Sequence, residues 1–378
     1  MRSGPAPAEK RPRHTPGNLK STLAPGWIIP LGGKMIFGTK EILLALTPLP
    51  PGMKIAAQIT PEPTQEELDF INQMGVEYVV LWTGGDKASY DYYSSRKQLF
   101  ESAGLKVYGF GSFSVHNQDV ITLGLPGRDE KIEEYKTHLR NLGKAGIPYT
   151  TYAHMANGIW STEGELTRGN APARAFDLAK AKKGWWIDRT YEGPLTHGRT
   201  YSEEEIWENF IYFIKQVAPV AEEANVRIGI HPDDPPVHDL GGVPRCIFGN
   251  FDGYKRALEI ADSPNVGMCL CVGCWLEGGS KMGRDVFETI QYFGERKKLF
   301  KVHFRNVDQP MPHFVETFID DGYMDMYKVL KAMQAVDFDG VFIADHIPTM
   351  GGNPRVGTAY TIGYMKALLS RVNAEAKG

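Results

Sequence analysis

Short apolar runs alternate along the chain with longer segments in which hydrophobic residues recur every three or four positions. The short runs are nearly continuous and rich in β-branched and aromatic residues, as is typical of strands that are covered on both faces. The longer segments have the periodicity of amphipathic helices. We predict eight strands, at residues 54–58, 78–82, 106–111, 149–153, 226–231, 266–271, 300–304 and 340–344.

The segments between these strands read as helices with their own start and stop signals. In TQEELDFINQMG, Thr64 can cap the first turn and Gly75 can end the helix. An alternation of strand and helix repeated eight times favours parallel pairing through right-handed crossovers, and therefore an α/β fold of the (β/α)8 TIM barrel type. An open doubly wound sheet is the competing fold, but the glycine-rich phosphate loop that usually follows its first strand is not evident.

Two segments lie outside this repeat. Residues 1–50 begin with a basic, proline-rich stretch, and we predict an N-terminal arm there, partly disordered or packed on the barrel. Residues 51–378 are predicted to form one catalytic barrel. The connection from the fourth strand to Thr200 is unusually long, and such connections commonly serve as lids or binding loops.

Composition narrows the class of function. The 378 residues suit a single barrel, and 42% hydrophobic residues are enough for a large core. The formal net charge of −3 gives no basic footprint for nucleic acid. No apolar run approaches the roughly 18 residues of a membrane span. We therefore expect no nucleic-acid or membrane partner, and a cytoplasmic location agrees with so few cysteines.

The ends of four consecutive strands carry residues that bind metals. In barrels of this type the chemistry lies at the C-terminal strand ends. The fifth to eighth predicted strands end at His231, Cys271, His303 and Asp345. Imidazole, thiolate and carboxylate are ligands of divalent transition metals, so we predict a metal site here. We place Cys274, which has C-x-x-C spacing from Cys271, in a loop beyond the strand.

The neighbours of these ligands are candidates for substrate contacts. Asp233 and Asp234 follow His231 closely, and we expect them to orient the ligands or the substrate. Arg305 and Asn306 follow His303 directly and are predicted to hold a substrate carboxylate, the arginine through a two-pronged contact.

Several of these segments resemble the mannonate dehydratase family of the bacterial hexuronate pathway. The resemblance runs from SVHNQDV, residues 114–120, to the C-terminus. Its motifs stand in the family's order and comprise LGLPGRDEKIEEYKTHLRNLGKAGI, HPDDPP, LCVG, VHFRNV, MDM and ADHIPTM. HPDDPP and HFRNV are the most specific of them.

The resemblance implies a metal-dependent lyase that removes water from D-mannonate to give 2-keto-3-deoxy-D-gluconate. It implies manganese on the four strand-end residues, with zinc or cobalt as alternatives, and we expect a homo-oligomer that binds a small sugar acid. His346 matches the family's proposed acid/base histidine, and we assign Arg305 and Asp233 to catalysis with it. The residues assigned to substrate binding are Asn306, His116, Asp234 and Arg355.

Three segments depart from the family pattern. The first strand is KIAAQ instead of an RWYG-like sequence, and Asn117 replaces the acid of a VHE motif. The C-terminal segment lacks the PGYG-like stretch whose tyrosine is thought to be catalytic. These departures leave open a xylose-isomerase-like isomerase or epimerase, and also a sugar-acid-binding protein without catalysis. A structural zinc protein that uses Cys271 and Cys274 is the least favoured alternative.

Overall fold

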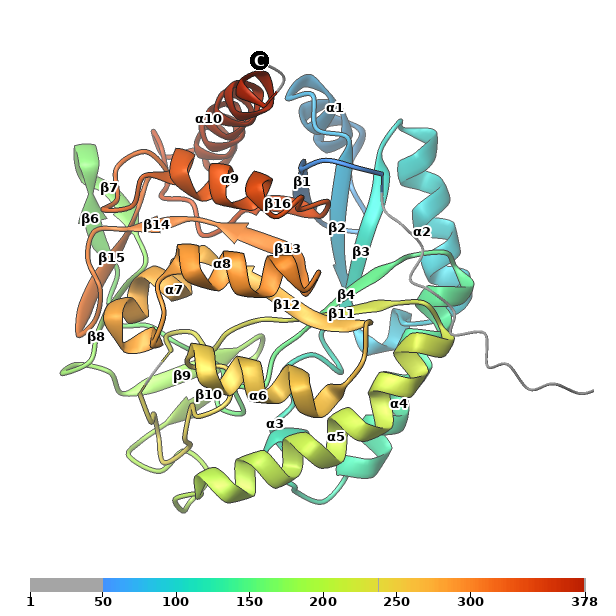
Figure 1. The fold of residues 1–378 in the computed structure, drawn as a ribbon, viewed down its shortest axis with the longest axis vertical. Helices are drawn as coiled ribbons and strands as arrows, with labels where there is room; N and C mark the ends of the chain where they lie inside the picture. Colours follow the sequence, from blue (N-terminus) through green and yellow to red (C-terminus); the bar gives the residue numbers. More distant parts are fainter. Residues whose placement is uncertain (1–49, 237, 377–378) are drawn as a thin grey trace, which may run out of the picture. The chain divides into compact units, whose positions relative to one another are not determined.

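The computed structural model describes residues 50–236 and 238–376. The predicted arm, residues 1–50, lies outside the described residues except for Pro50. Eight parallel strands of the described chain form one sheet, and each matches a predicted strand to within one residue at either end (Figure 1). In chain order they are β1 (Lys54–Ile59), β2 (Tyr78–Thr83), β3 (Lys106–Ser112), β4 (Tyr149–Tyr152), β11 (Arg227–Ile230), β12 (Val266–Cys271), β13 (Leu299–Phe304) and β16 (Val341–Ala344).

This sheet curls into a barrel. Its order is β3-β2-β1-β16-β13-β12-β11-β4, so that the first and last barrel strands of the chain pair with each other. The two outermost strands, β3 and β4, lie side by side and close the barrel. A Cβ atom on Gly109 would lie 2.5 Å from Cδ1 of Tyr149, so this seam requires glycine. The (β/α)8 TIM barrel is confirmed.

Helices surround the strands. Thr64 and Glu67 form a capping box at the start of α1, and Gly75, with a φ of 64°, follows its end as predicted. None of the helices in the described ranges combines the length and the apolar character that a membrane span needs. The helices are α1 (Gln65–Gln73), α2 (Tyr90–Ser102), α3 (Asp119–Thr122), α4 (Arg128–Lys144), α5 (Glu203–Glu223), α6 (Phe251–Ala261), α7 (Val272–Gly278), α8 (Val286–Glu295), α9 (Met326–Ala335) and α10 (Pro354–Glu375), with 3₁₀ turns at Gly85–Lys87, Arg168–Asn170 and Gly279–Met282.

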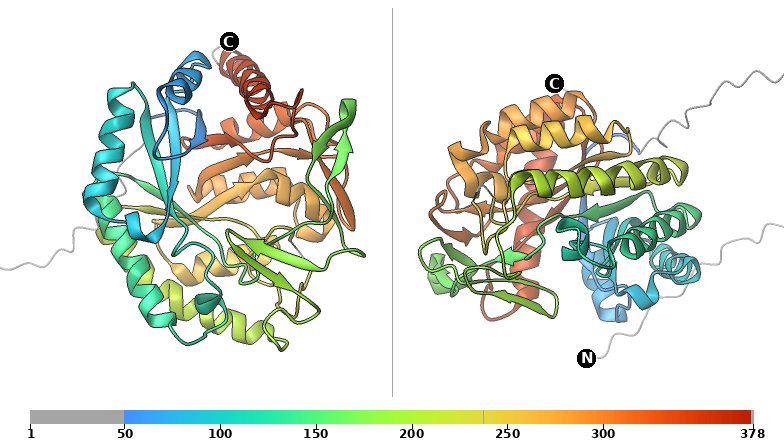
Figure 2. Two further views of the ribbon diagram at one scale, coloured as in Figure 1. Left: turned by 180° about the vertical axis from the view of Figure 1, so that it is seen from behind. Right: turned by 90° about the horizontal axis from the view of Figure 1, so that it is seen from below.

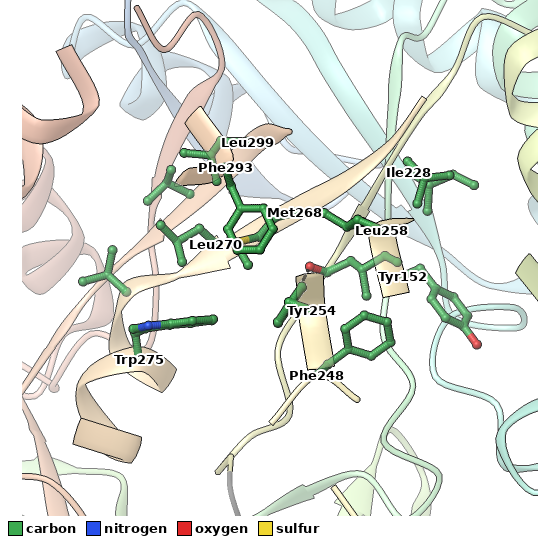
Figure 3. Close-up of a cluster of buried hydrophobic side chains, with 14 of the residues drawn as sticks. Tyr152, Ile228, Phe248, Tyr254, Leu258, Met268, Leu270, Trp275, Phe293 and Leu299 are labelled. Carbon is green, nitrogen blue, oxygen red and sulfur yellow. Dashed lines mark hydrogen bonds between the residues drawn. The ribbon is translucent and has the colours of Figure 1, made fainter. Parts of the chain in front are cut away.

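The main core lies between the strands and the helices. Figure 3 shows Met268 and Leu270 of β12 packed among side chains that include Tyr254 of α6, Trp275 of α7 and Phe293 of α8. Burial of each such side chain contributes about 1.5–3 kcal/mol to folding. Because successive residues of a strand point to opposite faces, the alternate residues of β12 face the barrel interior. The last two of those residues are Cys269 and Cys271, and Cys271 stands at the strand's C-terminal end.

The barrel interior holds a second, smaller cluster of buried side chains. Its members come from six different strands, which places them inside the barrel below the C-terminal strand ends. The buried Lys301 lies in the same interior and donates from Nζ to Oγ1 of Thr151 over 3.2 Å. Side chains therefore fill the barrel interior and support the residues at the C-terminal strand ends. The cluster comprises Ala56, Val80, Tyr108, Tyr149, Phe300, Val341 and Ile343.

The long connection between β4 and α5 forms sheets, not the irregular loop that its length suggested. Its strands are β5 (Ile159–Trp160), β6 (Glu165–Thr167), β7 (Ala171–Ala173), β8 (Ala175–Asp177), β9 (Lys183–Trp186) and β10 (Arg189–Glu192). Strand β8 pairs with β15 (His313–Thr317), which pairs with β14 (Asn306–Val307) just after β13. This insertion, green in Figure 2, is thereby joined to the segment that leaves the seventh barrel strand.

Candidate active site

Four side chains meet at the C-terminal ends of β11, β12, β13 and β16. Nε2 of His231 lies 3.1 Å from Nδ1 of His303, which lies 3.4 Å from Oδ2 of Asp345. Sγ of Cys271 lies 3.9 Å from the same carboxylate oxygen. Strand register explains the meeting, since Cys271 stands beside His303 and neighbouring parallel strands end at the same height. The structure therefore brings together the four residues predicted as metal ligands, and we call these four side chains the metal group.

The donor atoms of this group fit a divalent cation. Nδ1 of His231 lies 2.7 Å from the carbonyl oxygen of Pro232. Since a carbonyl only accepts, Nδ1 carries the proton and Nε2 presents its lone pair to the group. Around a tetrahedral ion, ligands of these types would lie about 3.3–3.6 Å apart, close to the observed separations. Nitrogen, sulfur and oxygen donors thus converge as a late or borderline transition metal requires.

Charge at the group also suits a cation. Burial alone would raise the pKa of Cys271, but a hydrogen bond with Cys274 and the charge of Arg305 bring this pKa well below the usual thiol value. Burial likewise opposes ionisation of Asp345, yet positive charge on His346 and His303 holds its pKa well below the usual range. Asp345 is therefore anionic at neutral pH, and the lowered pKa of Cys271 favours the thiolate form that metal ligands need.

Arg305 forms ion pairs with the carboxylates around it. Its side chain is 2% exposed, and its Nε donates to Oδ2 of Asp345 over 3.0 Å. Nη1 lies 2.5 Å from Oε1 of Glu277 and 2.8 Å from Oε1 of Glu316, and Nη2 lies 3.1 Å from Oδ2 of Asp234. The guanidinium of Arg305 is surrounded by carboxylates and holds Asp345, so the predicted two-pronged contact to a substrate has no free edge in this structure and stays a prediction.

A second arginine joins this network from the insertion. Arg174 lies between β7 and β8, and its Nη2 is 2.6 Å from Oδ1 of Asp234 while its Nη1 is 2.7 Å from Oε1 of Glu316. Burial raises the pKa of Glu277 to about 8, so that this carboxyl can be neutral between the two arginines. Buried charges are tolerated only when paired, and here the pairing fastens the insertion to the metal group.

His346 follows Asp345 with a φ of 42°, in the left-handed region. Its Nδ1 lies 2.8 Å from Oε1 of Glu316, an acceptor, so Nδ1 carries the proton. Burial alone would lower the pKa of His346, but the charges of Asp345 and Glu316 raise it to about 9. Its side chain is 32% exposed, so a proton can move between His346 and a bound molecule.

A cavity of about 670 Å³ opens above the metal group. Six of the predicted site residues line it, namely His116, His231, Asp234, His303, Asp345 and His346. Within the described ranges, no lysine, arginine or tyrosine does so. The other lining residues are Gln58, Ile59, Thr60, Pro61, Trp82, Phe113, Thr151, Met155, Ile159, Trp185, Trp186 and Ile187.

Three further predicted site residues lie away from this cavity. Asp233 is buried beside the loop that carries Phe248, and burial raises its pKa to about 6. The side-chain amide of Asn306 forms hydrogen bonds with backbone groups, and it donates to the carbonyl oxygen of Met324 over 2.8 Å. Arg355 begins α10 and pairs with Glu66 at the surface. None of the three lines the cavity, and the catalytic role given to Asp233 and the substrate contacts given to Asn306 and Arg355 stay predictions.

Cys274 also differs from its predicted loop position. It lies in the first turn of α7 and is fully buried. Its backbone N–H donates to Sγ of Cys271 over 3.4 Å, and its own Sγ accepts from Nη2 of Arg305 over 3.4 Å. Cys274 does not line the cavity, and its Sγ lies within 4.8 Å of ligand atoms of His231 and Cys271.

Comparison with known proteins settles the family. The model of the D-mannonate dehydratase (UxuA) family matches residues 61–377. The chain belongs to this family. It is 35% identical over 294 residues to the mannonate dehydratase of Streptococcus equi subsp. zooepidemicus, covering 72% of this chain and 78% of that protein. The crystal structure of mannonate dehydratase from Streptococcus suis serotype 2 aligns with a TM-score of 0.76 at 28% identity, over 87% of this chain and 95% of that one.

Other solved structures share only the fold with this member of the D-mannonate dehydratase family. A xylose isomerase domain protein from Planctomyces limnophilus aligns with a TM-score of 0.56 at 10% identity, over 86% of this chain and 99% of that one. An L-ribulose 3-epimerase aligns with a TM-score of 0.54 at 11% identity, over 86% and 97% of the two chains. The xylose-isomerase-like barrel is confirmed, while nothing in these likenesses carries an isomerase activity over to this chain.

Proposed function

We propose that this protein removes water from D-mannonate to give 2-keto-3-deoxy-D-gluconate, with manganese as its metal. The observation that carries the proposal is the convergence of His231, Cys271, His303 and Asp345 at the floor of a cavity that His346 also lines, in a chain of the D-mannonate dehydratase family. Manganese readily expands its coordination beyond four protein ligands, so it leaves room for substrate. Zinc and cobalt are the alternative metals.

A cation held by these four residues would stabilise the negative charge that develops beside the substrate carboxylate. The reaction removes the proton from C2, breaks the C3–O bond and releases water, and the resulting enol becomes the 2-keto acid. His346, protonated at neutral pH and held by Glu316, is placed to donate a proton to the departing C3 hydroxyl.

His116 complements His346 on the cavity wall. Burial lowers the pKa of His116 to about 3, and its Nδ1 lies 3.0 Å from the carbonyl oxygen of Thr151. Its Nε2 is therefore an unprotonated acceptor that can take a hydrogen bond from a substrate hydroxyl. A charged and a neutral histidine on one cavity are an arrangement suited to acid/base chemistry.

The sequence lacks the family's PGYG-like tyrosine, and no other tyrosine among the described residues lines the cavity. Tyr360 and Tyr364 belong to α10, as their sequence suggested, and the hydroxyl of Tyr360 accepts from Arg168. We therefore assign the proton donation to His346 alone.

The test is to strip the protein of metal, reload it with manganese, zinc or cobalt, and supply D-mannonate. We expect a 2-keto-3-deoxy acid, detected by the thiobarbituric acid colour reaction, and His346→Asn should lose rate while keeping its metal. No product with any of the three metals would overturn the proposal. Isomerised sugar acid in the same mixtures would favour the isomerase alternative, and tight binding without turnover would favour a binding protein.

A further inference from the structure

The tip of the β9–β10 hairpin carries an isoleucine that neither backbone geometry nor core packing explains. Ile187 is the first of the two residues that join the strands, and its φ is 57°. Two-residue turns place glycine or asparagine at positions with positive φ, and a β-branched residue there is strained. Ile187 is 49% exposed, yet it lines the cavity. A strained, exposed apolar residue beside a candidate active site points to a contact with a ligand.

The side chains next to this tip form an aromatic wall, which we define as Trp82, Phe113, Trp185 and Trp186. Trp82 and Phe113 are stacked with ring centroids 5.2 Å apart. Both Trp82 and Trp186 pack against the ring of His116, each with centroids 4.8 Å apart. The rings of Trp82, Phe113 and Trp186 therefore hold one another in place before any ligand arrives, while Trp185 is 44% exposed beside them.

One atom of the aromatic wall still needs a partner. Nε1 of Trp186 is buried and has no hydrogen-bond acceptor among the described residues. Nε1 of Trp82 has one, the side-chain oxygen of Gln58 at 3.2 Å. A buried indole N–H almost always finds an acceptor, so the unpaired donor of Trp186 sets it apart from Trp82.

The two sides of the cavity carry side chains of different chemical character. Its floor carries the metal group with His346, whereas its other side carries the aromatic wall together with apolar side chains such as Met155 and Ile159. A volume of about 670 Å³ is in the range of sites that enclose drug-sized ligands, and an acyclic six-carbon acid would fill only part of it. D-mannonate carries hydroxyls along its whole length and would leave the aromatic wall without a matching surface.

We propose that this protein also accepts, and prefers to D-mannonate, a sugar acid that bears a second sugar ring, and that the ring stacks on the aromatic wall. A pyranose has an apolar C–H face that can stack on the indole rings. The proposal rests on the proposed function, because the acid end of this substrate reacts at the metal floor. Carbons 1 to 3 react there, so the ring is attached at C4, C5 or C6. The C2 proton and the C3 hydroxyl leave as water, and the glycosidic bond stays intact.

The test compares D-mannonate with 4-O-β-D-glucopyranosyl-D-mannonate on the manganese-loaded protein. We expect kcat/KM for the disaccharide acid to be about two- to tenfold higher, which is the gain that one stacked ring contributes. Turnover of D-mannonate with an equal or higher kcat/KM would overturn the ring proposal and leave the proposed function standing. If neither acid turns over, the proposed function fails. The ring proposal is then judged by calorimetric binding, where equal affinity for the two acids overturns it.

Two variants test the hairpin tip. Trp185→Ala and Ile187→Gly should each lower the preference for the disaccharide acid severalfold. Ile187→Gly removes the strain at φ 57°, so its Tm should stay the same or rise while the preference falls. Leu166→Ala is the matched control, because Leu166 is 63% exposed next to the turn of the β6–β7 hairpin and does not line the cavity. An unchanged preference in both test variants, or a loss equal to that of the control, would contradict the proposal.

Discussion

The two ends of the cavity are built in different ways. The metal floor, by which we mean the metal group together with His346, lies at the ends of four neighbouring barrel strands. Hydrogen bonds between the strands and the packed barrel interior below fix these ends. Half of the aromatic wall, Trp185 and Trp186, comes from the β9–β10 hairpin, which belongs to an insertion and carries exposed apolar side chains at its tip. A barrel can therefore keep its chemistry on the rigid floor while substrate choice varies with the inserted segment.

Arg174 links the two ends. It reaches from the insertion to Asp234 and Glu316, which also contact Arg305, and Arg305 holds Asp345. The insertion is thus fastened to the floor by a buried charge network, while its hairpin tip is free of that network. Changes at the floor should affect metal and rate, and changes at the tip should affect which acid is preferred.

The largest expected effect separates two neighbouring thiols at the floor. Cys271→Ser should lose most bound metal and lower activity at least about 100-fold, because a serine hydroxyl is not ionised at neutral pH and is a poor ligand. Cys274→Ser should keep its metal, because its backbone N–H still reaches residue 271 and its hydroxyl can still accept from Arg305. Metal content by mass spectrometry of the purified variants gives the answer. Metal loss in Cys274→Ser but not in Cys271→Ser would remove Cys271 from the ligand set.

The next effect tests whether Glu316 positions His346. Glu316→Gln should lower kcat about 10–100-fold, because the amide no longer offers a charged acceptor to Nδ1 of His346. KM and metal content should change little. Glu165→Gln is the matched control, since Glu165 pairs with His313 at 2.8 Å on the insertion surface, away from the metal group. A similar fall in kcat for both variants, or a fall explained by metal loss, would show that Glu316 has no special relation to His346.

The strand ends could be predicted from sequence because each ligand follows an apolar run of the right length. His231, Cys271, His303 and Asp345 are placed by strand register, which local patterns determine well. The network behind them could not be predicted, because Arg174 lies between two short strands and Glu316 lies in a third, and their pairing depends on contacts between segments far apart in the chain. Arg305 illustrates the gap. Its position beside His303 could be read from the sequence, but the carboxylates that surround it could not.

The smallest effect concerns two histidines, His138 and His346, whose pKa values shift in opposite directions. Burial lowers the pKa of His138 to about 3, and its ring bonds to Tyr93 and Thr150, far from the cavity. His346 has a pKa raised to about 9. In the metal-free protein, the stability that His346 contributes is fully present below its unfolded pKa of about 6.5 and is lost as pH rises through 9. The contribution of His138 is present above about pH 6.5 and is lost as pH falls toward 3.

Urea unfolding of metal-free protein at a series of pH values measures both contributions. Between pH 6.5 and 4.5, each histidine that stays neutral in the fold lowers the free energy of unfolding by about 1.4 kcal/mol per pH unit as the unfolded chain takes up its proton. His138→Gln should remove one such contribution and flatten the acid slope, whereas His346→Gln should leave that slope unchanged and flatten the fall between pH 7 and 9. The same slopes in both variants would mean that the two histidines do not differ in charge. The assignment of a positive charge to His346 would then fail, because that charge depends on the carboxylates around His346 and not on burial.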